Sequence, residues 1–129
     1  MAKAQTLEPE PVENIRWLDD VAAHDYEAAA AYLSLKLDSE AVGKLVKRLR
    51  KAPLTRRRAN DILRAAGLTA APLDDPGVMK DLIKVIEGKR LSPVLVIGGN
   101  ASADIADGYH RVSLVYRIDP FGEIPVKLA

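Results

Sequence analysis

Ile105-Ala106-Asp107-Gly108-Tyr109-His110-Arg111-Val112 is the stretch around which the rest of the chain is organised. An apolar run of strand length, Ser92-Pro93-Val94-Leu95-Val96-Ile97-Gly98-Gly99, comes before it. After it, apolar residues repeat at helical spacing at Val112, Leu114, Val115 and Ile118. The pattern predicts a strand, a hairpin strand, a tight glycine turn and a helix. The first turn of that helix carries Tyr109, His110 and Arg111.

The last stretch, Ile124-Pro125-Val126-Lys127-Leu128, predicts a closing strand. We expect it at an edge of the sheet, because Pro125 lacks the N–H group that a central strand uses. Upstream, apolar periodicity and capping residues predict four helices, over about 26–37, 39–51, 55–66 and 78–87. The stretch 14–22 fits a short strand or a short helix. The expected fold class is α+β, with a helical N-terminal part packed on a small mixed sheet.

We divide the chain into three segments. Residues 1–11 are polar and contain prolines, so we expect a frayed N-terminus. Residues 12–75 form the helical extension, and residues 76–129 form the α/β part that packs with it as one compact unit. In the extension, Asp25, Asp38 or Ser39, and Thr55 are the expected N-caps of successive helices.

The composition excludes several kinds of site. The 129 residues include no cysteine, which excludes disulfides, thiolate metal sites and cysteine nucleophiles. The two histidines, His24 and His110, are far apart in the sequence, so we expect no metal site. No run reaches the ~18 apolar residues of a membrane span, and no signal peptide is recognisable. We therefore expect a cytoplasmic protein without a membrane partner.

Charge is unevenly distributed, although the net charge is only +1. Residues 1–40 contain nine acidic and three basic residues, whereas residues 41–60 contain eight basic and no acidic ones. A basic block in a near-neutral protein predicts a local anionic partner. The basic segment 44–58 is therefore a candidate surface for nucleic acid or for an adaptor partner, although no aromatic residues alternate with its basic ones for base stacking.

The densest part of this segment is the arginine run, Arg56-Arg57-Arg58. With Thr55 as N-cap, the run would occupy the first turn of a helix, where acidic residues are preferred. Arginine also recognises phosphate in a bidentate manner. The run predicts a second phosphate contact or a nucleic-acid face. The alternative is ion pairing with the acidic N-terminal segment or with Asp74 and Asp75.

The glycine turn is the first candidate site. A helix N-terminus presents unpaired N–H groups and the positive end of its dipole to an anion, and a glycine lets a ligand approach the backbone. Positive side chains at this helix start oppose the dipole, and an anionic ligand would offset that cost. The predicted phosphate or nucleotide ligands are Gly108, Tyr109, His110 and Arg111. The alternative is a hairpin turn in which Asp107 caps the helix and the basic side chains are solvated.

The order and spacing of three elements resemble the ParB/sulfiredoxin superfamily. The elements are Ser92-Pro93-Val94-Leu95-Val96, the turn Ala106-Asp107-Gly108-Tyr109-His110-Arg111-Val112 and the closing strand at 124–128, and the match spans about residues 76–128. His24-Asp25-Tyr26 and Asn60-Asp61-Ile62-Leu63-Arg64-Ala65 add a resemblance to small bacterial ParB-like proteins. The resemblance implies that the turn cradles nucleotide phosphates through its amides, with His110 and Arg111 as phosphate or ribose ligands.

Differences from that family restrict the function. The cysteine of sulfiredoxins falls on Tyr109, which excludes sulfinic-acid reductase activity. The nucleotide-binding Lys, Ser and Thr of the preceding helix fall on Val78, Asp81 and Val85. Partition-type ParB proteins continue into a DNA-binding helix-turn-helix module that this sequence does not include, and their "GERR" turn is only half retained.

Three hypotheses follow. The first is a nucleotide- or phosphate-binding ParB-like module, non-catalytic or weakly catalytic, with the arginine run closing the site. The second is a phosphotransferase on a small hydroxyl substrate, similar to free-serine kinases, which would use a nucleoside triphosphate with Mg²⁺ and a carboxylate base. Its candidate catalytic residue is Asp107, with Glu13, Asp19 or Asp20 as the upstream carboxylate. The third is a nucleic-acid-binding or adaptor protein that uses segment 44–58.

Overall fold

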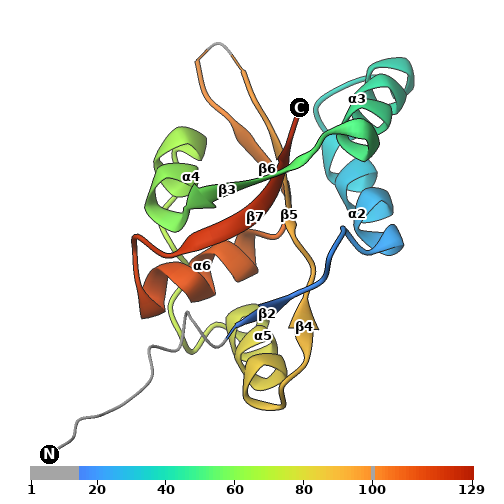
Figure 1. Cartoon of the computed structure of the whole chain (residues 1–129). Coiled ribbons are helices and arrows are strands. Elements are labelled where there is room, and N and C mark those ends of the chain that lie inside the picture. The colour runs from blue at the N-terminus through green and yellow to red at the C-terminus, as the bar shows by residue number, and fades with distance from the viewer. Residues whose placement is uncertain (1–14, 100) are drawn as a thin grey trace, which may run out of the picture.

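The computed structural model describes residues 15–99 and 101–129, which form an α+β fold (Figure 1). The elements along the chain are β2 (Arg16–Trp17), α2 (Ala23–Leu33), α3 (Ser39–Lys51), β3 (Leu54–Arg58), α4 (Ala59–Ala66), α5 (Pro76–Ile86), β4 (Arg90–Leu91), β5 (Val94–Ile97), β6 (Asp104–Asp107), α6 (Tyr109–Ile118) and β7 (Glu123–Leu128). The predicted fold class is confirmed, and so is the order of strand, hairpin strand, turn and helix around Gly108. The predicted frayed segment 1–11 and the candidate base Glu13 lie outside the described residues.

Four strands form the main sheet, in the order β3-β7-β5-β6. β7 pairs antiparallel with β3 and parallel with β5, and β5 pairs antiparallel with β6. The prediction that residues 124–128 form an edge strand is wrong, because β7 lies between two neighbours. Pro125 is tolerated there because β7 pairs with β5 only from Val126 onward, so the missing N–H removes no hydrogen bond from that ladder.

β3 is a second departure from the prediction. Residues 55–58 form a strand and not the first turn of a helix, since α4 begins only at Ala59. Every residue of β3 has a partner in β7, from Leu54 opposite Lys127 to Arg58 opposite Glu123. This pairing with a distant segment overrides the local capping pattern at Thr55. The extension over 12–75 is therefore not purely helical, and of the arginine run only Arg58, the N-cap of α4, lies at a helix N-terminus.

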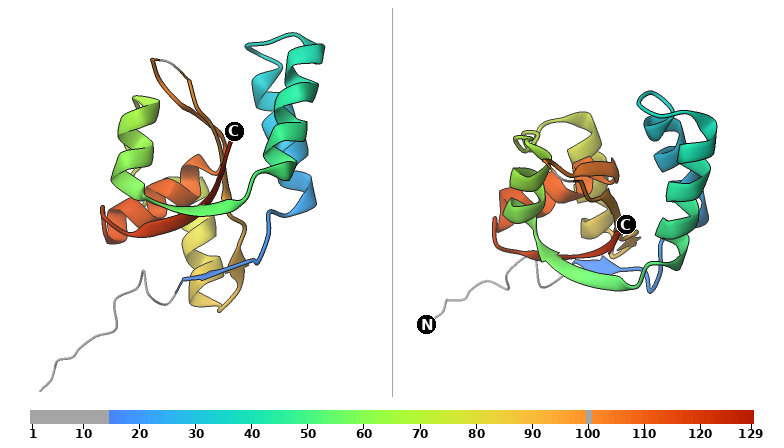
Figure 2. Two further views of the ribbon diagram at one scale, coloured as in Figure 1. Left: turned by 45° about the horizontal axis from the view of Figure 1, so that its top comes forward. Right: turned by 90° about the horizontal axis from the view of Figure 1, so that it is seen from above.

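Both faces of the main sheet are covered by helices. All four residues of β5 are buried. Val94 and Val96 pack in one core with residues of α4 and α6, whereas Leu95 and Ile97 pack in another with residues of α2 and α3. Because successive side chains of a strand point to opposite faces, one apolar strand serves both cores. The result is a helix–sheet–helix arrangement (Figure 2).

The helix ends explain most of the element boundaries. Asp38 accepts a hydrogen bond from the Ala41 N–H at 2.8 Å and is the N-cap of α3, as predicted. Asp75 accepts hydrogen bonds from two amides of the first turn of α5, so that helix begins at Pro76 and not at residue 78. The stretch 14–22 contains a short strand, β2, which pairs parallel with β4.

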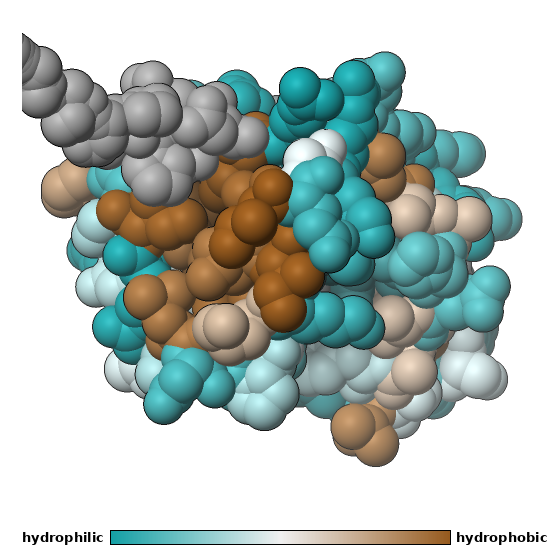
Figure 3. Space-filling view, turned by 90° about the horizontal axis from the view of Figure 1, so that it is seen from below, coloured by the Kyte–Doolittle hydropathy of each residue, from teal (hydrophilic) through white to brown (hydrophobic). Residues whose placement is uncertain are grey.

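α5 has two different long faces. Its Met79, Ile83 and Ile86 are exposed apolar residues at helical spacing. Figure 3, seen from below, shows apolar side chains gathered over part of the surface on the side where α5 lies. Lys80 and Lys84 of the same helix line a cavity between α5 and the start of α2. α5 therefore separates an apolar surface from a polar cavity.

Candidate functional site

Gly108 makes the turn between β6 and α6 and cannot be replaced without strain. Its φ is +113°, a left-handed conformation that side chains rarely adopt. A Cβ atom here would lie 2.8 Å from a methyl carbon of Val94 and 3.2 Å from an Arg111 nitrogen. The turn places Tyr109, His110 and Arg111 on the first turn of α6, as predicted.

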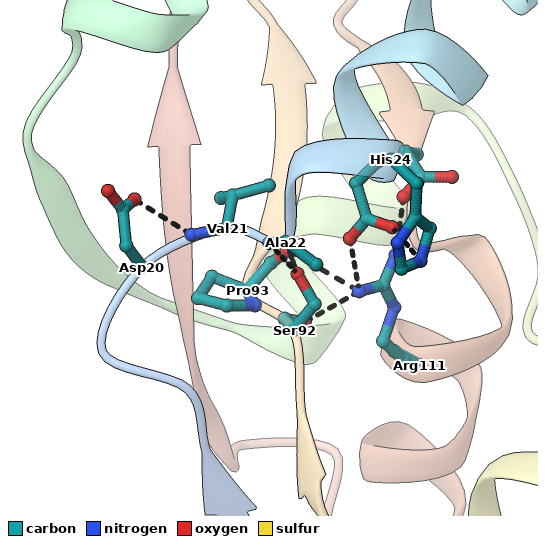
Figure 4. Close-up of polar contacts among 9 residues, drawn as sticks. Asp20, Val21, Ala22, His24, Ser92, Pro93 and Arg111 are labelled. Atoms are coloured by element: carbon teal, nitrogen blue, oxygen red, sulfur yellow. Dashed lines mark hydrogen bonds and ion pairs between the residues drawn. The ribbon is translucent and has the colours of Figure 1, made fainter.

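Arg111 is nearly buried and fully engaged by the protein. One terminal nitrogen lies 3.1 Å from a carboxylate oxygen of Asp25 and donates to the Ser92 carbonyl at 2.7 Å. The other donates to Asp107 at 2.7 Å, and only 12% of the side chain is exposed. Figure 4 shows the guanidinium directed toward Ser92 and the start of α2, where His24 lies. Arg111 thus joins three segments of the fold, with two carboxylates offsetting its charge.

Asp25 has a different role from the predicted one. The N-cap of α2 is Ala22, and Asp25 lies inside the first turn as one of the few buried charged residues. Its other carboxylate oxygen lies 3.2 Å from Nε2 of His24, whose side chain is largely exposed. Burial of a carboxylate requires a compensating partner. Arg111 provides that partner.

Two more carboxylates in this region have pKa values shifted upward. Burial raises the pKa of Asp107, and the neighbouring Asp25 adds to the rise, while Arg111 acts in the opposite direction. Burial also raises the pKa of Asp81 on α5; nearby basic residues, Arg111 first among them, oppose the rise through their charge alone. Both carboxyl groups therefore hold a proton more readily than an exposed aspartate does.

These residues surround one cavity of about 350 Å³, which we call the Arg111 cavity. Its polar lining residues are His24, Asp25, Lys80, Asp81, Lys84, Arg90, Ser92, Asp107 and Arg111. Asp25 is buried and only 12% of the Arg111 side chain is exposed, whereas His24, Lys80 and Arg90 are exposed. The cavity consequently has paired charges inside and basic side chains at its rim, a combination suited to an anionic ligand.

The other predicted ligands of the turn lie outside this cavity. The Tyr109 hydroxyl donates to the Thr69 carbonyl at 2.6 Å, and the residue lines a second cavity together with Gly108. His110 lies at the N-terminus of α5, with Nε2 3.3 Å from a carboxylate oxygen of Asp75. A Cβ atom on Gly77 would lie 2.6 Å from the His110 ring, so the ring rests directly on the helix backbone. Only Asp107 borders both cavities.

The remaining candidates are also separated from the Arg111 cavity. The arginine run lies on β3, where Arg56 and Arg57 line two further cavities. Asp19 lines one of these. Asp20 lies 3.3 Å from Nζ of Lys127, and its pKa is lowered by a hydrogen bond from the Val21 N–H and by Lys127. Asp19 and Asp20 therefore do not line the Arg111 cavity. Among the described candidates for the catalytic base, Asp107 does.

We found neither a metal site nor a membrane span in the described part of the chain. No group of three or more His, Asp or Glu residues in 15–99 and 101–129 is arranged to hold a metal ion. None of the described helices has the length and apolar character needed to cross a membrane.

No protein-family model, curated protein or solved structure matches this chain. The resemblance to the ParB/sulfiredoxin superfamily therefore stays a prediction. The residues that line the cavities are the basis for any functional inference.

Sequence reasoning missed most of the Arg111 cavity. Asp25 stands four residues before Ala29 and eight before Leu33, two buried residues of α2. A carboxylate on the buried stripe of a helix implies a basic partner, so this spacing could have identified it. Lys80 and Lys84, also four residues apart, resemble an ordinary solvated helix face. No local pattern separates them from one.

Proposed function

We propose that the protein binds a phosphorylated small molecule, such as a nucleotide, in the Arg111 cavity. The observation that carries the proposal is the convergence of Lys80, Lys84 and Arg90 on a cavity that already contains a paired arginine. Among the described residues, none of the three lies within ion-pair distance of a carboxylate, although the charges of Lys80 and Lys84 act on Asp81. Their positive charges are available to an anion.

The roles in phosphate binding differ from those implied by the family resemblance. Arg111 is occupied by Asp25, Asp107 and a backbone carbonyl, so we assign it a positioning role. The direct phosphate contacts fall to Lys80, Lys84 and Arg90. The start of α2 lies at the same cavity and adds the positive end of a helix dipole.

The size of the cavity favours a small ligand. A volume of about 350 Å³ is at the lower end of the ~300–1,000 Å³ typical of small-molecule sites. It suits a phosphorylated metabolite, or the phosphate portion of a nucleotide whose base lies outside. Arginine and lysine side chains at an open rim allow either arrangement.

A second candidate function is phosphoryl transfer to a small hydroxyl substrate. The observation that favours it is the presence of Asp81 and Asp107, both with raised pKa values, beside the basic side chains. A carboxylate in this position would accept the proton of the hydroxyl group as its oxygen attacks the terminal phosphorus and the bond to the leaving phosphate breaks. Mg²⁺ would enter with the nucleotide.

Binding is tested by thermal denaturation and calorimetry with ATP, ADP, CTP, GTP and pyrophosphate, each with and without Mg²⁺. A ligand at 100 times its dissociation constant adds about 2.7 kcal/mol of stability. We expect Lys80→Ala, Lys84→Ala and Arg90→Ala each to weaken binding about tenfold, because each removes one charge-assisted contact. Lys47→Ala, an exposed lysine of α3, is the matched control.

Two outcomes would contradict the proposal. One is the absence of any stabilisation by these ligands, and the other is an equal loss of affinity in the Lys47→Ala control. Phosphoryl transfer is tested separately, by measuring nucleotide consumption with small hydroxyl compounds. If the Asp107→Asn variant still binds the nucleotide but no longer consumes it, the result supports phosphoryl transfer. If the unchanged protein binds the nucleotide and does not consume it, the result supports the binding function alone.

A further inference from the structure

The two edge strands of the main sheet, β6 and β3, differ in how far other parts of the chain cover them. At the β6 edge, Tyr32 and Lys36, the first on α2 and the second just after it, each contact Asp104 at 2.9 Å. The pairing of β6 with β5 is also irregular, with a register shift between Leu95 and Val96. Such coverage and irregularity protect an edge against further strands. The β6 edge is therefore closed.

The β3 edge is open in the described part of the chain. β3 pairs with β7 along its whole length on one side, and no described strand pairs with its other side. Apart from the β7 ladder, no backbone hydrogen bond within residues 15–99 and 101–129 involves residues 54–58. In the view from above, β3 runs along the outside of the molecule (Figure 2). Its outer N–H and C=O groups form a template for another strand.

The arginine run determines which strand the edge accepts. All three arginines are exposed. A second copy of β3 placed against this edge would bring arginine opposite arginine, and like charges directly opposite one another are destabilising. An acidic strand would instead form opposite-charge pairs across the same edge. The charge pattern thus excludes self-pairing and selects an acidic partner.

The arginines have only weak partners in the protein itself. Nε of Arg56 lies 3.7 Å from a carboxylate oxygen of Glu123, and more than half of each side chain is exposed. The Arg58 guanidinium lies 5.8 Å from the centre of the Phe121 ring. Exposed ion pairs of this kind contribute about 0–1 kcal/mol, so they do not prevent the arginines from binding an acidic segment.

Cavities lie on both faces of the open edge, at successive residues. Arg57 stands opposite Ile124 and lines a cavity of about 390 Å³ that also includes Ile62 and Leu128. Arg56, on the opposite face, lines a cavity of about 330 Å³ with Trp17. An added strand directs its side chains alternately to the two faces. Each face then offers apolar side chains and an arginine, with one aspartate, Asp61 or Asp19, also in the lining.

We propose that the open edge of β3 binds an extended acidic segment of a partner protein as a fifth strand of the main sheet. Main-chain hydrogen bonds to β3 would supply affinity, and the two cavities and the arginine run would supply specificity. The surface is distinct from the Arg111 cavity and shares only Leu18 with its lining. A peptide fits this edge better than nucleic acid does, because nucleic acid would use the arginine charges and leave the backbone groups unpaired.

The experiment uses the full chain and a fluorescein-labelled peptide, Ac-Val-Glu-Val-Asp-Val-Glu-Val, with fluorescence anisotropy as the readout. We expect the triple variant Arg56→Glu/Arg57→Glu/Arg58→Glu to weaken binding roughly tenfold or more, because it reverses the charge pairs across the edge. The matched control is Lys44→Glu/Lys47→Glu/Arg48→Glu on α3, which changes the net charge equally. It should change the affinity less than twofold. Circular dichroism checks that both variants are folded.

Two further probes separate strand addition from charge attraction. The first is the same peptide with its five central backbone nitrogens methylated, which retains the side chains but cannot donate N–H groups. We expect at least a tenfold loss of affinity for it, and unchanged affinity would overturn the proposal. The second is a single-stranded oligo-dT of twenty nucleotides. Tighter binding of this oligonucleotide, weakened by the β3 triple variant and not by the α3 control, would also overturn the proposal and assign the surface to nucleic acid.

Discussion

Arg111 and the arginine run show how differently the same side chain is used in one small fold. Arg111 is 12% exposed and bound to two carboxylates, whereas Arg56 is 59% exposed with one distant partner. The first arginine holds three segments together, and the others face outward along an open strand. A basic residue that was expected to contact a ligand is thus bonded to the protein itself, and residues that were expected to lie on a helix form an edge strand.

Removing Arg111 should have the largest effect on stability. Arg111→Ala leaves two carboxylates without their partner, and loss of one member of a buried ion pair costs about 3–5 kcal/mol. The free energy of unfolding, measured by urea denaturation at pH 7, should fall by that amount. Arg57→Ala is the matched control and should remain within about 0.5 kcal/mol of the unchanged protein. Equal losses of unfolding free energy in Arg111→Ala and Arg57→Ala would contradict the different roles of the two arginines.

The turn that delivers Arg111 should be the next most sensitive point. Gly108→Ala places a Cβ atom against Val94 at a φ of +113°, and a strained backbone of this kind costs about 1–3 kcal/mol. Gly43→Ala in α3 is the control, since its added Cβ meets nothing within 4 Å. It should be neutral or stabilising by up to about 1 kcal/mol. Thermal denaturation of the two variants tests the difference, and similar melting temperatures would contradict it.

The effect of Arg111→Ala should depend on pH. Arg111 lowers the pKa of Asp107 against the rise caused by burial, so removal of Arg111 raises that pKa further. A carboxyl group with a raised folded-state pKa stabilises the fold below its unfolded pKa of about 3.9, and this contribution is lost as the pH rises through the folded-state pKa. Arg111→Ala should therefore cost more at pH 7 than at pH 4, by about 1.4 kcal/mol per unit of added pKa shift.

Urea denaturation of both proteins at the two pH values measures this difference. Arg57→Ala should show no comparable dependence on pH. An identical cost of Arg111→Ala at pH 4 and pH 7 would indicate that Asp107 is not coupled to Arg111.

The smallest effect is expected at the edge strand. Arg56→Ala removes an exposed pair with Glu123, and such pairs contribute about 0–1 kcal/mol. Salt screens them, so the difference in unfolding free energy should vanish in 1 M NaCl. A loss above about 2 kcal/mol that persists in high salt would mean that β3 depends on its arginines for folding and not for binding.

Local patterns predicted the part of the fold that is built locally. β5, β6, the Gly108 turn and α6 follow one another directly, and each has its own pattern of apolar residues or glycine. The prediction for β3 was wrong because its partner, β7, lies more than sixty residues later in the sequence. Three arginines after a threonine resemble a helix start when that partner is unknown.

The candidate site was predicted less well, for the same reason. Arg111 was correctly placed on the first turn of α6, but its contact with Asp25 joins residues 86 positions apart. Without that contact, Arg111 appears free to bind phosphate. The cavity alone brings together Lys80, Lys84 and Arg90. Their spacing along the sequence does not indicate that they line the same cavity.

The central place of β7 has a consequence for how the protein is made. β3 and β5 do not pair with each other and are joined only through β7, the last of the described strands along the chain. Helices α2 to α5 and the β5–β6 hairpin can form early, but the sheet cannot close until residues 123–128 are available. Until that moment β5 lacks its strand partner on the β7 side. Synthesis that stops just before β7 should therefore yield an aggregation-prone chain and not a smaller domain.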